Sequence, residues 1–433
     1  MTPRDAARAI FDTALAAADV RPLVLAALAD VTPARGRLRV VGAGKASGAM
    51  ASAAEEALGD RLEGGVVAVK DGYLAPTRQI RLLEAGHPVP DERGAAAARE
   101  ILTEVRHARP DDLVLVLVSG GASALTPAPA PPVTLADKQA VTRLLLAAGA
   151  TINELNAVRK HLSLIKGGQL TRAAAPARVH ALLLSDVIGD PLDVIGSGPT
   201  APDASTFSDA LEILERFQVR GRAPASVISR LEQGRQGAIA ETPKANDPIF
   251  HRVTNVVIGN NALVVDAAAA RARALGFTPH ALTRSLEGEA RQVARDFVGL
   301  ARSIQAGRGP VAPPACVLAG GETTVTVRGP GAGGRCQEFA LAAALEMDGL
   351  DGVVVLAAGT DGTDGPTAAA GAVADGASAR RAGEGVGDPH ARLAANDSHP
   401  VFAALGDLVV TGPTNTNLLD LYLMLVTPPP PRP

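Results

Sequence analysis

Residues 320–338 read Gly-Gly-Glu-Thr-Thr-Val-Thr-Val-Arg-Gly-Pro-Gly-Ala-Gly-Gly-Arg-Cys-Gln-Glu. This stretch follows the apolar run 316–319 and precedes a helical pattern from Cys336 to Met347. A strand therefore ends at a glycine loop that carries Arg335 to the start of a helix. In such a loop the backbone N–H groups can approach an anion closely. One acid, Glu322, and one arginine in this setting suit a phosphate with its metal better than a packed core.

The same succession of apolar run, glycine loop and helical pattern recurs along the chain. Many of the apolar runs are continuous, as expected for strands buried on both faces. Alternation with alanine-rich helices predicts an α/β fold with parallel sheets and ligand sites beyond the strand carboxyl ends. The expected strands are 38–42, 66–70, 80–83, 113–118, 179–184, 253–258, 316–319, 323–327, 353–357 and 408–411, and the longer expected helices are 46–58, 91–105, 153–174 and 286–305.

The length of 433 residues exceeds what one ordinary core accommodates and predicts two domains. The least motif-like stretch, 220–255, is rich in glycine and proline and marks the expected boundary. We therefore expect an N-terminal domain over 1–240, a C-terminal α/β domain over 250–427 and a disordered proline-rich tail over 428–433.

Composition argues against several classes of function. The net charge of −3, the aromatic content of 2% and the absence of tryptophan argue against a nucleic-acid partner. Residues 1–21 carry three aspartates among alanines and predict an amphipathic helix rather than a signal peptide, and no apolar run reaches membrane-spanning length. Two cysteines form no disulfide framework or zinc spacing. We expect a cytoplasmic protein without a membrane partner.

The loop 42–48 joins the first expected strand to a helix. It does not match the P-loop pattern, which needs Ser or Thr where Ala46 follows Lys45. It comes close to the dinucleotide fingerprint, with Glu63 or Asp71 as the acid about twenty residues on. A simple strand-to-helix turn is an equally good explanation of the glycines alone. Lys45 at a helix start favours an anion site, because a cation there needs an answering negative charge.

Five more segments of this kind follow apolar strands or lie beside them. The serines and glycines of 119–123 can wrap a carboxylate or phosphate, or form a tight turn with Ser123 as a helix cap. Loop 185–200 carries three acids that suit metal or serve as turn caps, and loop 358–365 offers Asp361 and Asp364 as metal ligands or a base. Loop 411–417 is polar, and the turn 86–90 presents His87.

The segment 156–168 places Arg159, Lys160 and Lys166 on a helical pattern that ends at two glycines. These cations form either a binding edge or a solvated face at a helix C-terminus. Acids and glycine loops, with Lys45 and Arg335 as the main cations, are the parts that phosphoryl transfer needs.

The order of the motifs resembles the glycerate 2-kinase family, whose members often carry the name hydroxypyruvate reductase. The resemblance rests on GAGKASGAM (42–50), GHPVPDERG (86–94), VSGGASAL (118–125), NAVRKHLSLIKGGQL (156–170), LSDVIGDPLDVIGSGPTAPD (184–203), the stretch 320–338, AAGTDGTDGPTAAAGA (357–372) and TGPTNTN (411–417).

The resemblance implies a Rossmann-like N-terminal domain, a smaller C-terminal α/β domain and an active site in the cleft between them. It also implies ATP-dependent, Mg²⁺-assisted phosphorylation of D-glycerate at the 2-hydroxyl by a monomer or homodimer. Cys336 stands where the family often has Asn, and Pro413, Thr416 and Leu418 also depart from its pattern. These departures bear on one polar contact to substrate or nucleotide.

We accordingly expect catalytic roles for Lys45, Arg335, Asp186 and Asp361. The carboxylate of glycerate is expected on the 119–123 loop, and Mg²⁺ on Asp190, Asp193 and Glu322. Substrate and nucleotide contacts are expected at Gly44, Ser47, His87, Ser119, Gly120, Gly121, Ser123, Lys160, Ser197, Gly198, Gly320, Gly321, Glu322, Thr323, Gly334, Thr360 and Asn415. The alternatives are an NAD(P)H-dependent hydroxypyruvate reductase that uses loop 42–48 and a non-catalytic phosphosugar or nucleotide sensor.

Overall fold

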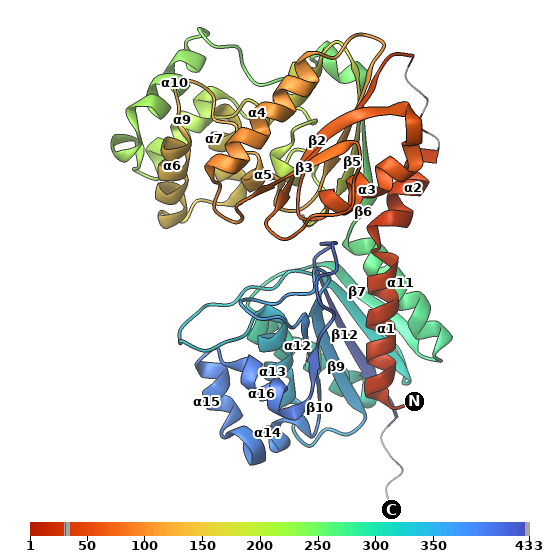
Figure 1. Ribbon diagram of the computed structural model, residues 1–433. Helices are drawn as coiled ribbons and strands as arrows, with labels where there is room; N and C mark the ends of the chain where they lie inside the picture. Colours follow the sequence, from red (N-terminus) through yellow and green to blue (C-terminus); the bar gives the residue numbers. More distant parts are fainter. Residues whose placement is uncertain (30, 32–34, 429–433) are drawn as a thin grey trace, which may run out of the picture. The chain divides into compact units, whose positions relative to one another are not determined.

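The computed structural model describes residues 1–29, 31 and 35–428 and contains two compact α/β units (Figure 1). The N-unit is Val20–Ile258, and the C-unit joins Met1–Asp19 to the chain from Gly259 onward. Each unit is built on its own six-stranded sheet, which confirms the prediction of two α/β domains. In the part of the chain that is described, no helix combines the length and apolar character needed to cross a bilayer.

The N-unit sheet has the strand order β3-β2-β1-β4-β5-β6, the order of dinucleotide-binding folds. Strand β1 pairs in parallel with β2 and β4, and these pair in parallel with β3 and β5. The strands are β1 Leu38–Ala43, β2 Leu62–Lys70, β3 Ile80–Ala85, β4 Leu113–Val118, β5 Arg178–Leu184 and β6 Val253–Gly259. The α-helices are α2 Val20–Ala29, α3 Ser47–Leu58, α4 Glu92–Arg106, α5 Ala122–Leu125, α6 Leu135–Ala147, α7 Ile152–His161, α8 Gln169–Ala174, α9 Phe207–Arg216 and α10 Ala225–Arg235.

The C-unit sheet is mixed and has the order β11-β10-β9-β12-β8-β7. Strand β12 runs antiparallel between β8 and β9, whereas β7 and β8 are parallel. The strands are β7 Thr278–Leu286, β8 Ala315–Gly321, β9 Val353–Gly359, β10 Gly371–Asp375, β11 Leu408–Val409 and β12 Asp420–Val426. The helices are α1 Pro3–Ala17, α11 Asn261–Ala274, α12 Ala290–Gln305, α13 Arg335–Glu346, α14 Ser378–Val386, α15 Pro389–Ala394 and α16 Ser398–Leu405.

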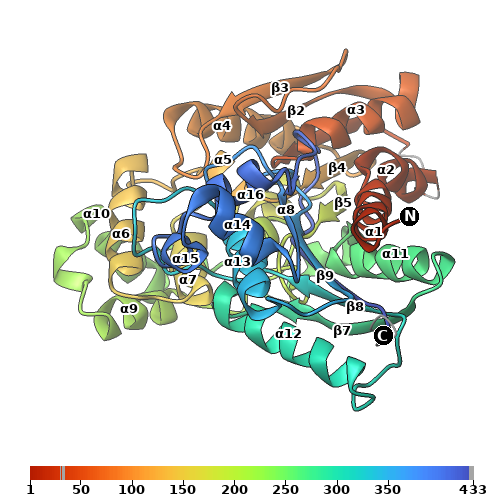
Figure 2. The same cartoon turned by 90° about the horizontal axis from the view of Figure 1, so that it is seen from below.

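The N-terminal helix completes the C-unit rather than the N-unit. One face of the C-unit sheet packs on α12 and α13 through Phe297 and Phe339, and α1 and α11 lie side by side against the sheet on the other side (Figures 1 and 2). Phe11 of α1 is fully buried, and Arg4 bonds Asp375 at 2.5 Å and Asp407 at 2.6 Å. The division therefore differs from the expected 1–240 and 250–427: residues 1–19 cover apolar strands of the later sheet, while β6 extends the first sheet.

Three expected elements are wrong in detail. Residues 323–327 form no strand, and the strand beside β8 on that side is β12, from the end of the chain. The expected helix 153–174 is two helices, α7 and α8, because Gly167 and Gly168 adopt positive φ angles of 59° and 76°. The expected helix 286–305 begins at Ala290, since Leu286 ends β7. The expected tail 428–433 lies outside the described residues except for Pro428.

Candidate active site

In the N-unit the expected loops meet at one edge of the sheet, because β1, β3, β4 and β5 are parallel and their carboxyl ends coincide. The Lys45 N–H donates to Gly120 O at 2.8 Å, and the Ser119 N–H donates to Ala43 O at 3.1 Å. The Ser119 hydroxyl accepts from Ala46 N and contacts Ser47 Oγ, both at 3.0 Å. Both serine side chains are fully buried. Ser119 and Ser47 thus fix the loop that carries Lys45, a structural role.

His87 and Lys45 converge on Gly121. A Cβ on Gly121 would lie 3.0 Å from His87 Cδ2 and 3.5 Å from Lys45 Cγ, and this glycine has a φ of +87°. Burial, with the positive charges of Lys45 and Lys70, lowers the pKa of His87 to about 4. His87 is therefore neutral at physiological pH and offers a hydrogen-bonding ring beside the Lys45 ammonium.

The loop after β5 packs onto α5 and α7. The Ser197 hydroxyl bonds Ser123 Oγ at 2.9 Å and donates to Asn156 Oδ1 at 3.1 Å. Ser123 also accepts from Arg159 and, at 3.0 Å, from Lys166 Nζ. Gly198 has a positive φ and packs against the backbone of Asp193, and Gly44 packs in a similar way against Ser119. Asp186 and Asp190 lie half-buried on the same loop.

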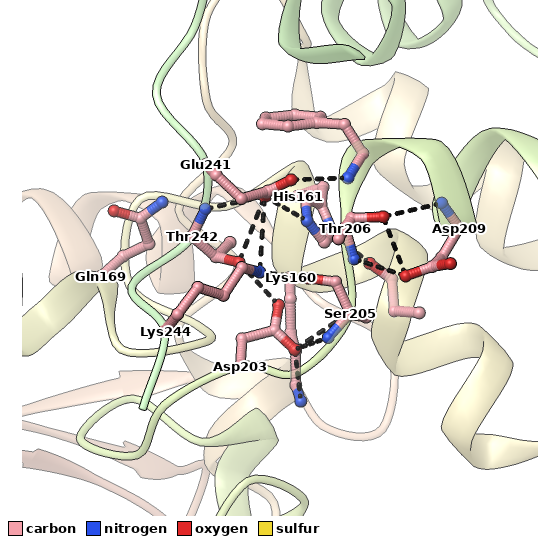
Figure 3. A network of polar contacts seen from close by, with 12 residues as sticks. Lys160, His161, Gln169, Asp203, Ser205, Thr206, Asp209, Glu241, Thr242 and Lys244 are labelled. Carbon is pink, nitrogen blue, oxygen red and sulfur yellow. Dashed lines mark hydrogen bonds and ion pairs between the residues drawn. The ribbon is translucent and has the colours of Figure 1, made fainter. Parts of the chain in front are cut away.

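Lys160 belongs to a buried polar network that ties α7 to the segments 203–209 and 241–244 (Figure 3). Its ammonium lies 3.1 Å from Asp193 Oδ2 and 3.2 Å from Asp203 Oδ1, and both Lys160 and Asp203 are buried. The network continues from Asp203 through Thr242 to Glu241, which accepts from His161 at 2.8 Å. With two carboxylates already paired to it, Lys160 has the geometry of a structural residue.

In the C-unit the expected residues gather where β8 and β9 end and β12 begins. Asp420, the first residue of β12, stands opposite Gly321 on one side and Gly359 on the other. Arg335, the first residue of α13, donates from Nε to Asp420 Oδ2 at 2.6 Å and from Nη2 to Oδ1 at 2.8 Å. Its remaining nitrogen, Nη1, lies 2.7 Å from Glu322. The guanidinium is thereby held in a fixed direction while part of its side chain stays accessible.

Asp420 and Tyr422 were not found from the sequence. The Tyr422 hydroxyl donates to Asp420 Oδ2 at 2.9 Å and bonds Thr323, so the Arg335–Asp420 pair rests on a buried chain of contacts. Burial alone would lower the pKa of Arg335. The hydrogen bonds to Asp420 and its negative charge have the larger combined effect, so the pKa of Arg335 is raised above its ordinary value. The sequence signal that could have identified it is Asp420 itself, which directly precedes the apolar run 421–426.

A carboxylate of the protein itself, that of Asp364, caps the N-terminus of α13. Buried Asp364 accepts from the N–H groups of Cys336 at 3.1 Å and Gln337 at 2.8 Å, and a Cβ on Gly334 would lie 2.3 Å from Asp364 Oδ1. Asp364 therefore occupies the space that a side chain at position 334 would need. Burial raises the pKa of Asp364 to about 6.

The other expected C-unit residues line the same edge. A Cβ on Gly359 would lie 3.2 Å from Asp420 Oδ1 and 3.4 Å from Asp361 Oδ1, so these two carboxylates are neighbours. Thr360 is buried, accepts from the Leu418 N–H at 2.8 Å and donates to Leu419 O at 2.8 Å. Gly320 packs against Asn261, Gly321 against Leu286, and Asn415 adopts a positive φ of 55°. Cys336 and Leu418, two of the family departures, are buried.

Within the described residues, no three His, Cys, Asp or Glu side chains form a cluster that could hold a metal on their own. Mg²⁺ in kinases is usually held by one or two carboxylates together with substrate phosphates, so a cluster of three is not required. Two of the three expected metal ligands already lie beside a cation: Asp193 is 3.1 Å from Lys160, and Glu322 is 2.7 Å from Arg335.

Comparison with known proteins shows which families and relatives this chain resembles. Residues 6–232 match the family described as a domain of unknown function (DUF4147), and residues 315–420 match the MOFRL family. The D-glycerate 2-kinase of Thermotoga maritima is 42% identical over 394 residues, which cover 90% of this chain and 91% of that protein. The chain belongs to the glycerate kinase family. A relative from Agrobacterium vitis, provisionally named a hydroxypyruvate reductase, is 45% identical over 428 residues that cover 98% of this chain and 95% of the relative.

Solved structures of the glycerate kinase family agree with the fold. The crystal structure of glycerate kinase from Thermotoga maritima has a TM-score of 0.90 and 40% identity, covering 98% of this chain and 99% of the other. A Pyrococcus horikoshii protein has a TM-score of 0.85 and 38% identity, covering 99% of each chain. The expected site in a cleft between the two domains stays a prediction, as do the individual roles of the site residues.

Proposed function

We propose that this glycerate kinase transfers the γ-phosphoryl group of ATP to the 2-hydroxyl of D-glycerate. The observation that carries the proposal is the 42% identity, over nine-tenths of both chains, to a D-glycerate 2-kinase. A Pyrococcus horikoshii relative named glycerate 2-kinase is 40% identical over 91% of this chain. The site chemistry is consistent with this activity, since phosphoryl transfer depends on positioned cations and polar loops.

Lys45 and Arg335 are the proposed cations for the transferred phosphoryl group. Lys45 stands at the start of α3, beyond the carboxyl end of β1, and Arg335 stands at the start of α13 with its direction set by Asp420. A guanidinium held in this way presents fixed donors to phosphate oxygens at little entropic cost. Asp186 or Asp361 takes the proton of the substrate hydroxyl.

Mg²⁺, when bound with ATP, neutralises negative charge on the phosphate oxygens. Glu322 in the C-unit and Asp190 and Asp193 in the N-unit are the proposed carboxylates for it. All three side chains are at least partly accessible, unlike the buried Asp203, Asp364 and Asp420.

The reductase alternative is less well supported by the geometry. Glu63 stands near the amino end of β2 and pairs with Arg37 at 3.5 Å, so it lies at the wrong end of the strand to bind a ribose. Asp71 follows the carboxyl end of β2, but Arg93 holds both of its oxygens at 2.7 and 2.8 Å. A dinucleotide would have to displace that bidentate pair.

The proposal is tested by two assays on one preparation: ADP release with D-glycerate, ATP and Mg²⁺, and NADH oxidation with hydroxypyruvate. We expect ADP release alone. Lys45→Ala and Arg335→Ala should each lower turnover by about 10²-fold or more with the far-ultraviolet circular dichroism unchanged. Near-normal turnover of either variant would refute its role. Cytoplasmic placement and a monomeric or homodimeric state are further proposals, and light scattering after size exclusion checks the second.

A further inference from the structure

A pocket of about 280 Å³ lies in the N-unit, apart from Lys45, and is lined by four basic residues. We call it the cationic pocket and define it by Lys138, Arg143, Arg159 and Lys166. Its other walls include Ser123 of α5, the turn 88–90 after His87, and Leu135 and Leu146 of α6. Val89 and Leu146 are 64% and 58% exposed, so its lining combines buried cations with accessible apolar side chains.

Two of these cations, Lys138 and Lys166, are buried and a third, Arg159, is half-buried, and none of the three has a negative partner among the ion pairs of the described residues. Lys138 Nζ donates to Pro127 O at 2.5 Å, Lys166 Nζ donates to Ser123 O at 2.7 Å, and Arg159 donates to the Ser123 hydroxyl. All of these acceptors are neutral. Among the ion pairs of the described residues, none involves a cation of this pocket. Burial, together with the charge of Arg159, lowers the pKa values of Lys138 and Lys166.

Lys160, the neighbour of Arg159 on α7, is a buried lysine whose charge is paired. It is as deeply buried as Lys138, but two carboxylates answer it at 3.1 and 3.2 Å. Buried charges without such partners cost several kcal/mol in proteins generally. The cationic pocket therefore holds basic groups with which no carboxylate of the described residues pairs, and an anion bound there would stabilise their charged forms.

The chain builds this concentration of charge through a break in a helix. Helix α7 ends at His161, just after Arg159, and residues 162–168 turn before α8 begins. Lys166 lies in that turn and reaches back to Ser123, the same residue that Arg159 contacts. An unbroken helix from 153 to 174 would place Lys166 seven residues along from Arg159, two turns away.

We propose that the cationic pocket binds a compact organic anion, one carboxylate or phosphate group with a short apolar part. The pocket shares Ser123 with the loop expected to hold glycerate, but neither Lys45 nor Arg335 lines it. The anionic group would meet Lys138, Arg159 and Lys166, and the apolar part would lie against the prolines and Leu146. The volume lies just below the range of about 300–1,000 Å³ usual for drug-sized ligands, which favours a small metabolite over a whole nucleotide. The turn 88–90 adjoins His87, so an occupant would contact the segment that presents His87 to Lys45.

The test is thermal unfolding of the full chain with pyruvate, inorganic phosphate or 3-phosphoglycerate, in the absence of ATP and Mg²⁺. At ten times the dissociation constant, the effective anion should raise the Tm by about 2–6 °C. An effect of pyruvate identifies a carboxylate site, and an effect of phosphate identifies a phosphate site. The shift should persist in Lys45→Ala and Arg335→Ala, which separates this pocket from the transfer site.

Lys138→Met and Lys166→Met are the deciding variants. Each removes a buried, unpaired charge, so each should unfold at an equal or higher temperature than wild type without anion and should lose the anion-dependent shift. Lys160→Met is the matched control, because it orphans Asp203: it should unfold at a lower temperature and keep the shift. Failure of all three anions to stabilise wild type, or a full shift in both Lys138→Met and Lys166→Met, would overturn the proposal. Neither result bears on the kinase assay.

Discussion

Asp420→Asn tests whether the direction of Arg335 matters for catalysis. Asp420 is 1% exposed and accepts two charge-assisted hydrogen bonds from Arg335, at 2.6 and 2.8 Å. Asparagine keeps the shape but replaces one acceptor oxygen with an amide donor that faces another donor. The pair of hydrogen bonds from Arg335 to residue 420 is therefore broken, and the guanidinium keeps Glu322 as its charged partner.

The size of the effect follows from that geometry. Removing one partner of a fully buried ion pair costs about 3–5 kcal/mol. Arg335 is partly exposed and retains Glu322, so we expect a loss of about 2–3 kcal/mol of folding stability. For catalysis the guanidinium stays but loses its direction, so we expect kcat/KM to fall by about 30- to 150-fold, near or below the roughly 10²–10³-fold loss that follows removal of a whole donor. The assay is steady-state ADP release with D-glycerate, with unfolding in urea measured on the same samples.

Asp407→Asn is the matched control in the same unit. The Asp407 side chain is only 9% exposed and accepts from two arginines, Arg4 at 2.6 Å and Arg381 at 3.0 Å, but it lies next to β11, whereas Asp420 begins β12. It should lose comparable stability and keep its kcat/KM. If Asp420→Asn and Asp407→Asn retain the same activity, Asp420 stabilises the fold and does not position Arg335.

Three further predictions concern stability. Phe11→Ala should cost about 3–5 kcal/mol and increase hydrogen exchange in 259–428 rather than in 35–258, since Phe11 of α1 is fully buried in the C-unit; faster exchange confined to 35–258 would contradict the placement of α1. The pKa of His87 is lowered to about 4, so the unfolded chain binds that proton more tightly and stability falls as pH drops from about 6.5 to 4. His87→Gln should therefore raise the Tm relative to wild type at pH 5 but not at pH 8. The pKa of Asp364 is raised to about 6, so its contribution is present below pH 4 and lost as pH rises through 6. Asp364→Asn should thus match or exceed the wild-type Tm at pH 8 and fall below it at pH 4, and a lower Tm at pH 8 would refute the sign.

Strands β1, β2, β4 and β5 of the N-unit could be predicted because most of their residues are buried. Strand β4 is a six-residue apolar run, buried along its whole length, and its carboxyl end carries the glycine loop that the motif predicts. Strand β7 was missed because it is mostly accessible and mixes Pro, His, Thr and Arg with its apolar residues. Strand β12 was missed although it is entirely buried. The alternating segment 323–327 was predicted as a strand and is not one.

The loops and strand ends that carry the candidate site could be predicted from the sequence. Lys45 and Arg335 stand where the glycine loops predict, each at the start of a helix. Partners that come from distant segments were out of reach: Asp420 lies 85 residues from Arg335, and Asp364 lies 28 residues from Cys336. Local patterns show which residues are unusual for a core, whereas burial and pairing depend on which strands become neighbours. The same reason left Arg159 and Lys166 undecided between a binding edge and a solvated face.

The most direct test of the proposed function is the ³¹P NMR spectrum of the products formed from D-glycerate, ATP and Mg²⁺ by the purified protein. We predict the resonance of 2-phosphoglycerate, growing as ADP forms and absent without Mg²⁺. A 3-phosphoglycerate resonance would contradict the position of transfer. Unchanged ATP, in a preparation that oxidises NADH with hydroxypyruvate, would contradict the kinase assignment itself.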